Sequence, residues 1–529
     1  MQINSIIIVG GGSSGWFTAS TLNKHCPEID VTLIESPNVP TIGVGESTNL
    51  NINWFLQSLD MTDEDWMPHC DASYKATIKF TDFHKKGESF HFPFGPKDLN
   101  YTNLGNEQQG HLNIGVDSWF LKKWMYPNTP QTDFAESFWP TMQMINKNKV
   151  HSNEDGVIPN FNIQDHWAYQ FDATKIGNWM KTNLCSNSTK YILDHVTNVN
   201  LNEHGWISSL STKEHGELKA DLYIDCTGFN SVLLEKALKV PHTNFEDNLI
   251  NNGTWVTRVP YIDQNVEMEL TTDGVAIGNG WVWNIPIWNS ISKGYVYSDK
   301  FIDKETALKE FKEHLKETNL WCNEKDVEEL EYRHINIKNG VHEKVWHKNC
   351  LAIGLSYGFI EPLESQGLVF TIEGIRKLMI ILQSKDRYVN QFDKECINKE
   401  MRNEIENSRD FITYHFIGSI RDDTEYWKWY TQELEFEYEI ITKARFSNFS
   451  FNEFSLAWQC ISIGNHMNLY TNFSVEEDVS LNKKMKNCIA LGIDQIFEYW
   501  KRRNNKINLL IDKSPTHYEY LKKIIYKRK

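Results

Sequence analysis

A glycine fingerprint near the N-terminus constrains the fold more than any other feature of the sequence. The apolar run SIIIV at residues 5–9 predicts a buried strand, and the G-x-G-x-x-G glycines Gly10, Gly12 and Gly15 follow it directly. A second apolar run, VTLIE, ends at Glu35. In a βαβ unit these glycines allow a tight turn, close approach to a pyrophosphate and helix–strand packing, while the acidic residue meets a ribose hydroxyl. The segment is therefore predicted to bind a dinucleotide.

Two later segments repeat the pattern of a strand followed by a glycine turn. In ADLYIDCTGFNS (220–231) an apolar strand ends at Asp225, before Thr227 and Gly228, as expected where a later strand returns to the same cofactor. In NCLAIGLSYGFIEPLESQG (349–367) a strand precedes Gly354 and the start of a helix. Three such turns with long insertions between them suit an FAD enzyme better than an NAD dehydrogenase.

These segments predict an α/β fold. It consists of an FAD-binding Rossmann-like domain of the aromatic-hydroxylase type, intergrown with a mainly helical substrate subdomain. We expect the FAD-binding domain over residues 1–376, with inserted substrate-site segments at about residues 80–160, and the helical subdomain over residues 377–529. The glycine-containing loop PTIGVGEST (40–48) is expected to wrap around the cofactor.

Charge and cysteine usage exclude several classes of protein. The net charge of −16 argues against a nucleic-acid partner and against an anionic membrane. No apolar run approaches the ~20 residues that span a bilayer, and no signal peptide is evident. The nine cysteines are scattered without a C-x-x-C pair, so we expect no disulfide framework, no metal site and a cytoplasmic protein with reduced thiols.

Several motifs together resemble the flavin-dependent tryptophan halogenase family. They are G-W-x-W-x-I-P at residues 280–286, E-P-L-E-S at 361–365, the loop at 40–48, HWAYQFDATKIGNWM at 166–180 and DASYKATIKF at 71–80. The resemblance implies halogenation of an indole or another electron-rich aromatic substrate. It also implies FAD as FADH2, O2 and a halide ion as reactants, hypohalous acid confined within the enzyme, and a separate flavin reductase. A homo-oligomer is compatible with the sequence.

The resemblance also implies catalytic residues. The I-K-F context selects Lys79 as the lysine that presents the electrophilic halogen, with Lys75 as its competitor four residues earlier. Glu364 would stabilise the cationic ring intermediate and take its proton, next to Ser365. The cofactor-binding residues would be Gly10, Gly12, Ser13, Gly15, Glu35, Val44, Gly45, Glu46, Thr227, Gly228, Gly354 and Leu368.

The halide and substrate sites depart from the family pattern. The halide would lie at Gln366 and Gly367, where the family carries Thr-Gly, so a shift toward bromide or iodide is a hypothesis. Trp281 and Trp283 would keep organic substrates away from the flavin. Candidate residues for clamping the substrate ring are Phe92, Phe94 and Trp458.

Two other functions share part of these features. A flavin-dependent aromatic monooxygenase would have the same glycine motifs, but Trp281, Trp283 and Lys79 argue against this function. A non-catalytic flavin-binding protein would not need an intact lysine and Glu364. Halide-dependent product formation distinguishes the halogenase from both alternatives.

Overall fold

A six-stranded sheet carries the glycine fingerprints. The computed structural model describes residues 1–39, 44–98, 100–101, 112–113, 117–319, 324–435 and 492–527. The strand order is β10 (Thr189–Leu193), β2 (Asp30–Glu35), β1 (Ser5–Val9), β14 (Leu222–Asp225), β23 (Cys350–Ala352) and β22 (Trp346–His347). The first five strands are parallel and only β22 runs antiparallel. This parallel sheet confirms the predicted α/β, Rossmann-like fold.

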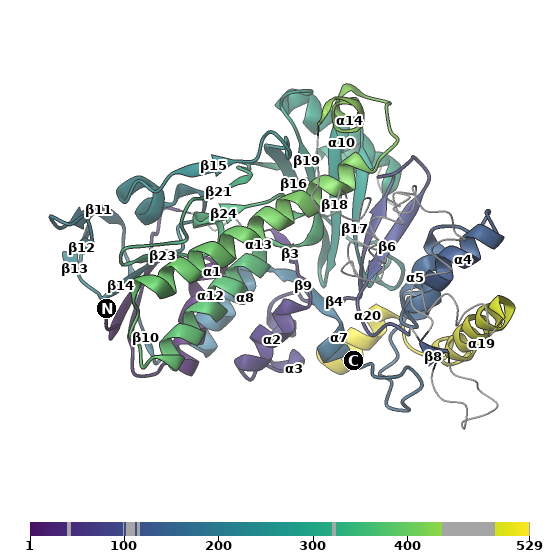
Figure 1. Cartoon of the computed structure of the whole chain (residues 1–529), viewed down its shortest axis with the longest axis horizontal. Coiled ribbons are helices and arrows are strands. Elements are labelled where there is room, and N and C mark those ends of the chain that lie inside the picture. The colour runs from purple at the N-terminus through teal and green to yellow at the C-terminus, as the bar shows by residue number, and fades with distance from the viewer. Residues whose placement is uncertain are drawn as a thin grey trace.

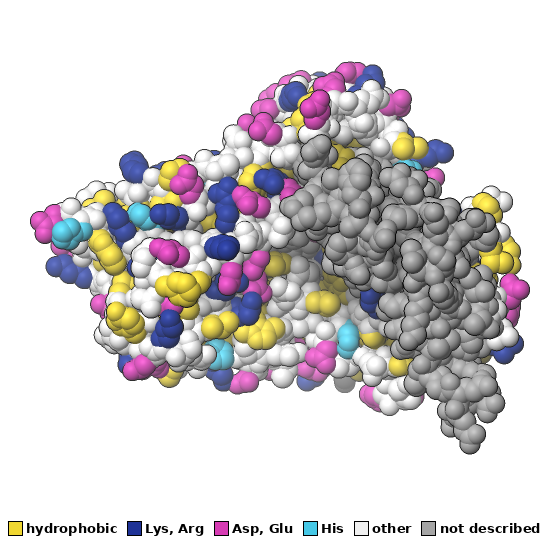
Figure 2. Space-filling model, in the orientation of Figure 1, with side chains coloured by type: hydrophobic (Ala, Val, Ile, Leu, Met, Phe, Trp, Pro, Cys, Tyr) yellow, Lys and Arg dark blue, Asp and Glu magenta, His cyan; other side chains and the backbone are white. Residues whose placement is uncertain are grey.

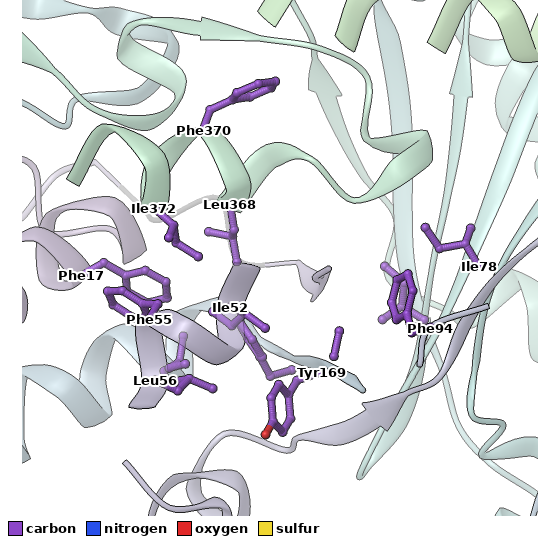
Figure 3. Packing of buried hydrophobic residues seen from close by; sticks show 14 of the residues in the cluster. Phe17, Ile52, Phe55, Leu56, Ile78, Phe94, Tyr169, Leu368, Phe370 and Ile372 are labelled. Atoms are coloured by element: carbon purple, nitrogen blue, oxygen red, sulfur yellow. The ribbon is translucent and has the colours of Figure 1, made fainter. Parts of the chain in front are cut away.

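Four helices pack beside this sheet and beside one another (Figure 1). They are α1 (Ser13–His25), α8 (Ala173–Asn183), α12 (Gly367–Ser384) and α13 (Gln391–Ile417). The ring of Phe17 on α1 stacks on Phe55 of α2 (Asn51–Ser58) with 4.6 Å between centroids, and Ile372 and Leu368 of α12 belong to the same buried cluster (Figure 3). Helix α12 passes through the expected boundary at residue 376, and one continuous hydrophobic core includes residues from Ile3 to Tyr526.

A seven-stranded sheet forms the second half of the molecule (Figure 1). Its order is β20 (Arg333–Asn336), β16 (Gly253–Val259), β19 (Ser290–Tyr297), β18 (Gly280–Ile287), β17 (Thr271–Ile277), β5 (Thr77–Thr81) and β6 (Ser89–Pro93). A small sheet of β3 (Gly45–Ser47), β9 (Ala168–Asp172) and β4 (Ser73–Lys75) lies beside it. The chain passes from β4 to β5 through the single residue Ala76, so adjacent residues enter different sheets.

The C-terminal part of the chain is helical where it is described. It contains α14 (Glu425–Lys428), α19 (Ile493–Ile511) and α20 (His517–Tyr520), of which α20 lies beside β4 (Figure 1). Among the described helices, none combines the length and the apolarity that crossing a bilayer requires. On the face shown in Figure 2, acidic and basic side chains are interspersed over the described surface.

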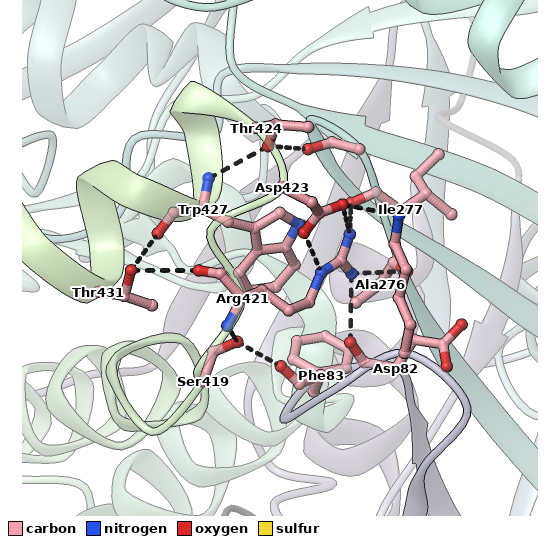
Figure 4. A network of polar contacts seen from close by, with 12 residues as sticks. Asp82, Phe83, Ala276, Ile277, Ser419, Arg421, Asp423, Thr424, Trp427 and Thr431 are labelled. Carbon is pink, nitrogen blue, oxygen red and sulfur yellow. Dashed lines mark hydrogen bonds and ion pairs between the residues drawn. The ribbon is translucent and has the colours of Figure 1, made fainter.

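Arg421, just after α13, ties the loop that precedes α14 to β17 (Figure 4). Its guanidinium donates to the carbonyls of Ala276 and Ile277, both at 3.0 Å, and to Asp423 Oδ1 at 2.9 Å. The residue is 4% exposed, so removing it leaves buried carbonyls unpaired.

We expect Arg421→Met to lower the free energy of unfolding by about 3 kcal/mol, measured by urea denaturation. The matched control is Lys86→Met, because Lys86 pairs with the same Asp423 at 2.8 Å from an exposed position. An exposed ion pair contributes little, at most about 1 kcal/mol. Equal losses in the two variants would contradict this interpretation of the network.

Candidate active site

A cavity of about 440 Å³ opens where the three predicted glycine turns meet. The turn after β1, the turn after β14 and the first turn of α12 form one side, and β17 and β18 of the second sheet form the other. Nine of the residues predicted to bind the cofactor line this cavity: Gly12, Ser13, Glu35, Val44, Gly45, Glu46, Thr227, Gly228 and Leu368. The fold therefore brings together predicted segments that are more than 300 residues apart in the sequence.

The other three predicted glycines lie behind the cavity wall. A Cβ on Gly10, whose φ is +119°, would lie 2.2 Å from the carbonyl oxygen of Cys226. A Cβ on Gly15 would lie 2.0 Å from the carbonyl oxygen of Gly10, and one on Gly354 would lie 2.3 Å from Ser14 Oγ. These glycines let the turns, α1 and α12 pack closely, whereas Gly12 faces open space in the cavity.

The lining fits a flavin dinucleotide. Gly12 caps α1 without a side-chain hydrogen bond, so the helix N-terminus presents free amides where a pyrophosphate would bind. Glu35 ends β2 at the cavity wall and accepts a hydrogen bond from the Tyr191 hydroxyl at 2.8 Å. Apolar side chains, among them Leu368 and Ile285, line the far end and suit a flat ring system. Burial raises the pKa of the Glu46 carboxyl to about 7.

Trp281 and Trp283 lie on one face of β18 and both line the cavity. Their ring centroids are 6.2 Å apart. A Cβ on Gly294, which pairs with Trp283 on β19, would lie 2.1 Å from the Trp283 ring, so only glycine leaves room for it. The indole N–H of Trp281 donates to Glu361 Oε2 at 2.8 Å. Glu361 is fully buried, and burial raises its pKa to about 7.

A fully buried lysine, Lys75, contacts a residue of this cavity lining. Its amine donates to the carbonyl of Thr48 at 2.7 Å and to the hydroxyl of Ser365 at 2.8 Å. Ser365 also lines the cavity, so it links the amine to the flavin side of the site. Burial lowers the pKa of Lys75 from 10.5 to about 7, against the attraction of Glu364. The Phe94 ring centroid lies 5.3 Å from the amine.

Lys79, the lysine that the sequence analysis selected, lies on β5 and has a different partner. Side chains alternate along β5, and Phe80 contacts the ring of His415 with 4.8 Å between centroids. Lys79 therefore points to the opposite face, where its amine pairs with Asp273 Oδ2 at 3.4 Å. Asp273 lines both the cavity of about 440 Å³ and a second cavity of about 750 Å³. The structure brings Lys75, not Lys79, to Ser365.

Glu364 is buried beside Ser365 and is bonded to His415, which the sequence analysis did not identify. Glu364 Oε1 lies 2.8 Å from His415 Nε2, and both side chains are almost completely buried. His415 Nδ1 donates to the carbonyl of Phe411 at 2.8 Å, so the Nε2–Oε1 contact must hold one proton. Ser365 has φ of +57°, a left-handed conformation that is uncommon for non-glycine residues.

The predicted halide and substrate residues are only partly brought together. Gly367 lines the cavity, and Gln366 Oε1 is buried with no hydrogen-bond partner in the described part of the chain. Phe92 packs edge-on against Phe94 with 5.6 Å between centroids, on the side of Lys75. Trp458 lies outside the described residues. Within the described ranges no group of three or more His, Cys, Asp or Glu could hold a metal ion.

The buried amine predicts a stability that depends on pH. The unfolded chain binds more protons than the folded one between pH 7 and 10.5, the two pKa values of Lys75, so wild-type stability rises with pH across this window. Lys75→Met removes this penalty. We expect the variant to melt several degrees higher than the wild type at pH 7 and to lose that advantage as the pH approaches 10.5.

Thermal denaturation over this pH range provides the measurement. Lys79→Met is the matched control, because it removes a lysine whose amine is partly exposed. A lower melting temperature for Lys75→Met at every pH would contradict the burial cost assigned to the amine.

Comparison with known proteins gives a consistent family. The model of the tryptophan halogenase family matches residues 5–466. The tryptophan 6-halogenase SttH of Streptomyces toxytricini is 32% identical over 445 residues, which are 80% of each chain. The tryptophan 7-halogenase RebH of Lentzea aerocolonigenes is 31% identical over 435 residues, covering 81% of this chain and 78% of that enzyme.

Solved structures agree with this family. The apo structure of VirX1 superimposes with a TM-score of 0.88 at 35% identity and covers all of both chains. The crystal structure of SttH superimposes with a TM-score of 0.80 at 28% identity, over 98% of this chain and 99% of that one.

Proposed function

Because the chain belongs to the tryptophan halogenase family, we propose that it halogenates an indole or another electron-rich aromatic ring, using FADH2, O2 and a halide ion. Flavin-dependent halogenation is the activity of the family. The substrate class and the roles of the individual residues are what we propose. The observation that carries it is the Lys75–Ser365 hydrogen bond, which joins a buried amine to the cavity that fits the flavin.

Reduced flavin, when bound, supplies the activation of O2 that oxidises halide to hypohalous acid. The chain contributes the surroundings of that reaction. The N-terminus of α1 and Glu35 bind the dinucleotide, and the apolar lining excludes water. Trp281 and Trp283 form the wall between the two sides of the site, so an aromatic substrate meets hypohalous acid and not the flavin.

Lys75 holds the oxidant where the ring can meet it. Its neutral amine, favoured by the lowered pKa, can accept the halogen from hypohalous acid or bond to the acid's oxygen. The aromatic ring takes the halogen as X⁺ and then loses one proton. The hydroxide that remains takes up one proton and leaves as water, so that hypohalous acid and the ring C–H become a C–X bond and water. Thr48 and Ser365 fix the amine in one position, so the halogen is presented to one ring position.

Glu364 completes the substitution. Its carboxylate stabilises the positive charge on the ring after the halogen adds, and the same oxygen pair accepts the ring proton. His415 shares the proton of Glu364 Oε1, so Oε2 is the oxygen available to the substrate. Phe94, next to Lys75, would pack against the ring.

The experiment is a mass-spectrometric screen. Purified chain, a separate flavin reductase with NADH, and FAD are combined with a panel of indoles and phenols, each with chloride, bromide or iodide. A product heavier by one halogen minus one hydrogen, formed only with halide, supports the proposal. Gln366 at the halide site favours bromide or iodide over chloride, and strict chloride preference would contradict that part.

The two alternatives give different products. A hydroxylated product that forms without halide would favour an aromatic monooxygenase. Flavin binding without any product across the whole panel would favour a non-catalytic protein. The Lys75–Ser365 contact favours the halogenase, because neither alternative requires a buried amine at the flavin cavity.

A further inference from the structure

Among the strands that the structure describes, none pairs with one edge of the strand that carries Lys75. In the sheet β3-β9-β4, β9 pairs with both other strands, and β4 is at the edge. Tyr74, next to Lys75, is fully buried. A buried N–H on a free strand edge costs free energy unless another group accepts from it.

An imidazole from the end of the chain accepts this N–H. The backbone N–H of Tyr74 donates to His517 Nε2 at 3.2 Å, across 443 positions of sequence. His517 Nδ1 donates to the carbonyl of Met268 at 3.1 Å, which fixes the tautomer in which Nε2 accepts. His517 is fully buried, and burial lowers its pKa to about 4, so the ring is neutral at pH 7.

A second residue of this C-terminal segment bonds just before β4. The Tyr526 hydroxyl lies 2.9 Å from the carbonyl oxygen of Ala72, the residue before β4, and 3.1 Å from that of Met67. It therefore helps to anchor the segment of His517 against the start of the lysine strand. Tyr526 is itself fixed by stacking on Trp288, with ring centroids 3.8 Å apart.

The remaining polar groups of Tyr74 are also bonded. Its hydroxyl donates to Asp63 Oδ2 at 2.7 Å, and its carbonyl oxygen accepts from Gln170 Nε2 at 3.2 Å. With the His517 bond, the N–H, the carbonyl oxygen and the hydroxyl of Tyr74, the residue before Lys75, all have hydrogen-bond partners. Figure 1 shows α20, which begins at His517, next to β4.

We propose that His517 is a positioning residue for Lys75: it replaces a missing strand at the free edge of β4 and so holds the amine in place between Thr48 and Ser365. This role rests on the proposed function, because it matters for the rate only if Lys75 presents the halogen. A displacement of about 1 Å at a reacting group can lower a rate by about 10²-fold.

The test compares three variants of the full-length chain. His517→Leu keeps the volume but cannot accept the N–H. His517→Gln places a carboxamide oxygen where Nε2 lies and is expected to rescue the contact. Ile525→Val, a buried tail residue with no bond to β4, controls for weaker packing of the tail. Each variant is assayed with indole and bromide for kcat, KM, flavin affinity and the fraction of oxidised flavin that yields bromoindole.

We expect His517→Leu to lower kcat by at least about tenfold and to lower the bromoindole fraction, with KM and flavin affinity unchanged. Hydrogen exchange of residues 72–76 should accelerate in His517→Leu alone. His517→Gln and Ile525→Val should retain the wild-type rate and protection.

Three outcomes would overturn the proposal. One is an unchanged kcat in His517→Leu. Another is equal loss in Ile525→Val, which would reduce the role of His517 to general stability. The third is unchanged exchange of residues 72–76. A wild type that brominates no aromatic substrate would overturn the proposed function itself and this role with it, so the two failures are distinguishable.

Discussion

Lys75→Ala is expected to lower halogenated product formation by at least about 10²-fold, while flavin binding and the rate of flavin oxidation stay unchanged. The amine is the only group that we assign to holding the oxidant, and alanine leaves nothing between Thr48 and Ser365 to replace it. The measurement compares flavin consumed with halogenated product formed, by absorbance and mass spectrometry. The hypohalous acid that is no longer held should appear in solution, where a trapping reagent detects it.

Lys79→Ala is the matched control for this prediction. Its amine lies four residues along the chain but pairs with Asp273 on the opposite face of the sheet. We expect this variant to retain most of the wild-type product yield. Loss of product in Lys79→Ala, with Lys75→Ala active, would return the assignment to Lys79.

Glu364→Gln is expected to lower kcat by about 10²-fold through loss of both charge stabilisation and proton acceptance. If the carboxylate takes the ring proton, its loss makes proton removal slow. A kinetic isotope effect should then appear with ring-deuterated indole in the variant and be absent from the wild type. Product analysis by mass spectrometry measures both quantities.

Glu361→Gln separates the two buried acids of this segment. Glu361 accepts hydrogen bonds from Asn251 and Trp281, and a glutamine carboxamide oxygen can accept both, so glutamine should preserve most of the rate. An isotope effect in Glu361→Gln, without one in Glu364→Gln, would exchange their assigned roles.

The fold could be predicted from sequence because its signals are short motifs. The spacing of Gly10, Gly12 and Gly15 is read within a few residues, and the turns at Thr227-Gly228 and Gly354 repeat the pattern, although the close contact of Gly10 is with the distant Cys226. The halogenase motif around Trp281 and Trp283 also lies within a few residues. The parallel sheet brings the glycine turns together, and β18 of the seven-stranded sheet brings the two tryptophans to the same cavity.

Local sequence context could not decide whether Lys75 or Lys79 is the lysine that we propose to hold the oxidant. Lys75 and Lys79 have the same parity, so a continuous strand would have placed both on one face. The chain instead leaves one sheet and enters another at Ala76, and only the paired strands β9, β17 and β6 reveal this break.

His415 and His517 were missed for a related reason. Each is a single buried histidine, and its partner lies far away in the sequence, Glu364 for the first and Tyr74 for the second. Nothing beside either histidine in the sequence indicates a polar partner. Such contacts follow from tertiary packing, which hydrophobic periodicity does not specify.

The bond between Tyr74 and His517 has a consequence for synthesis on the ribosome. A protein is made from its N-terminus, and the FAD-binding segments can fold while later segments are still being translated. The N–H of Tyr74 acquires its imidazole partner only after residue 517 has been made. We therefore expect a nascent chain to form the flavin cavity before the strand of Lys75 is fixed, so that flavin binding precedes control of the oxidant.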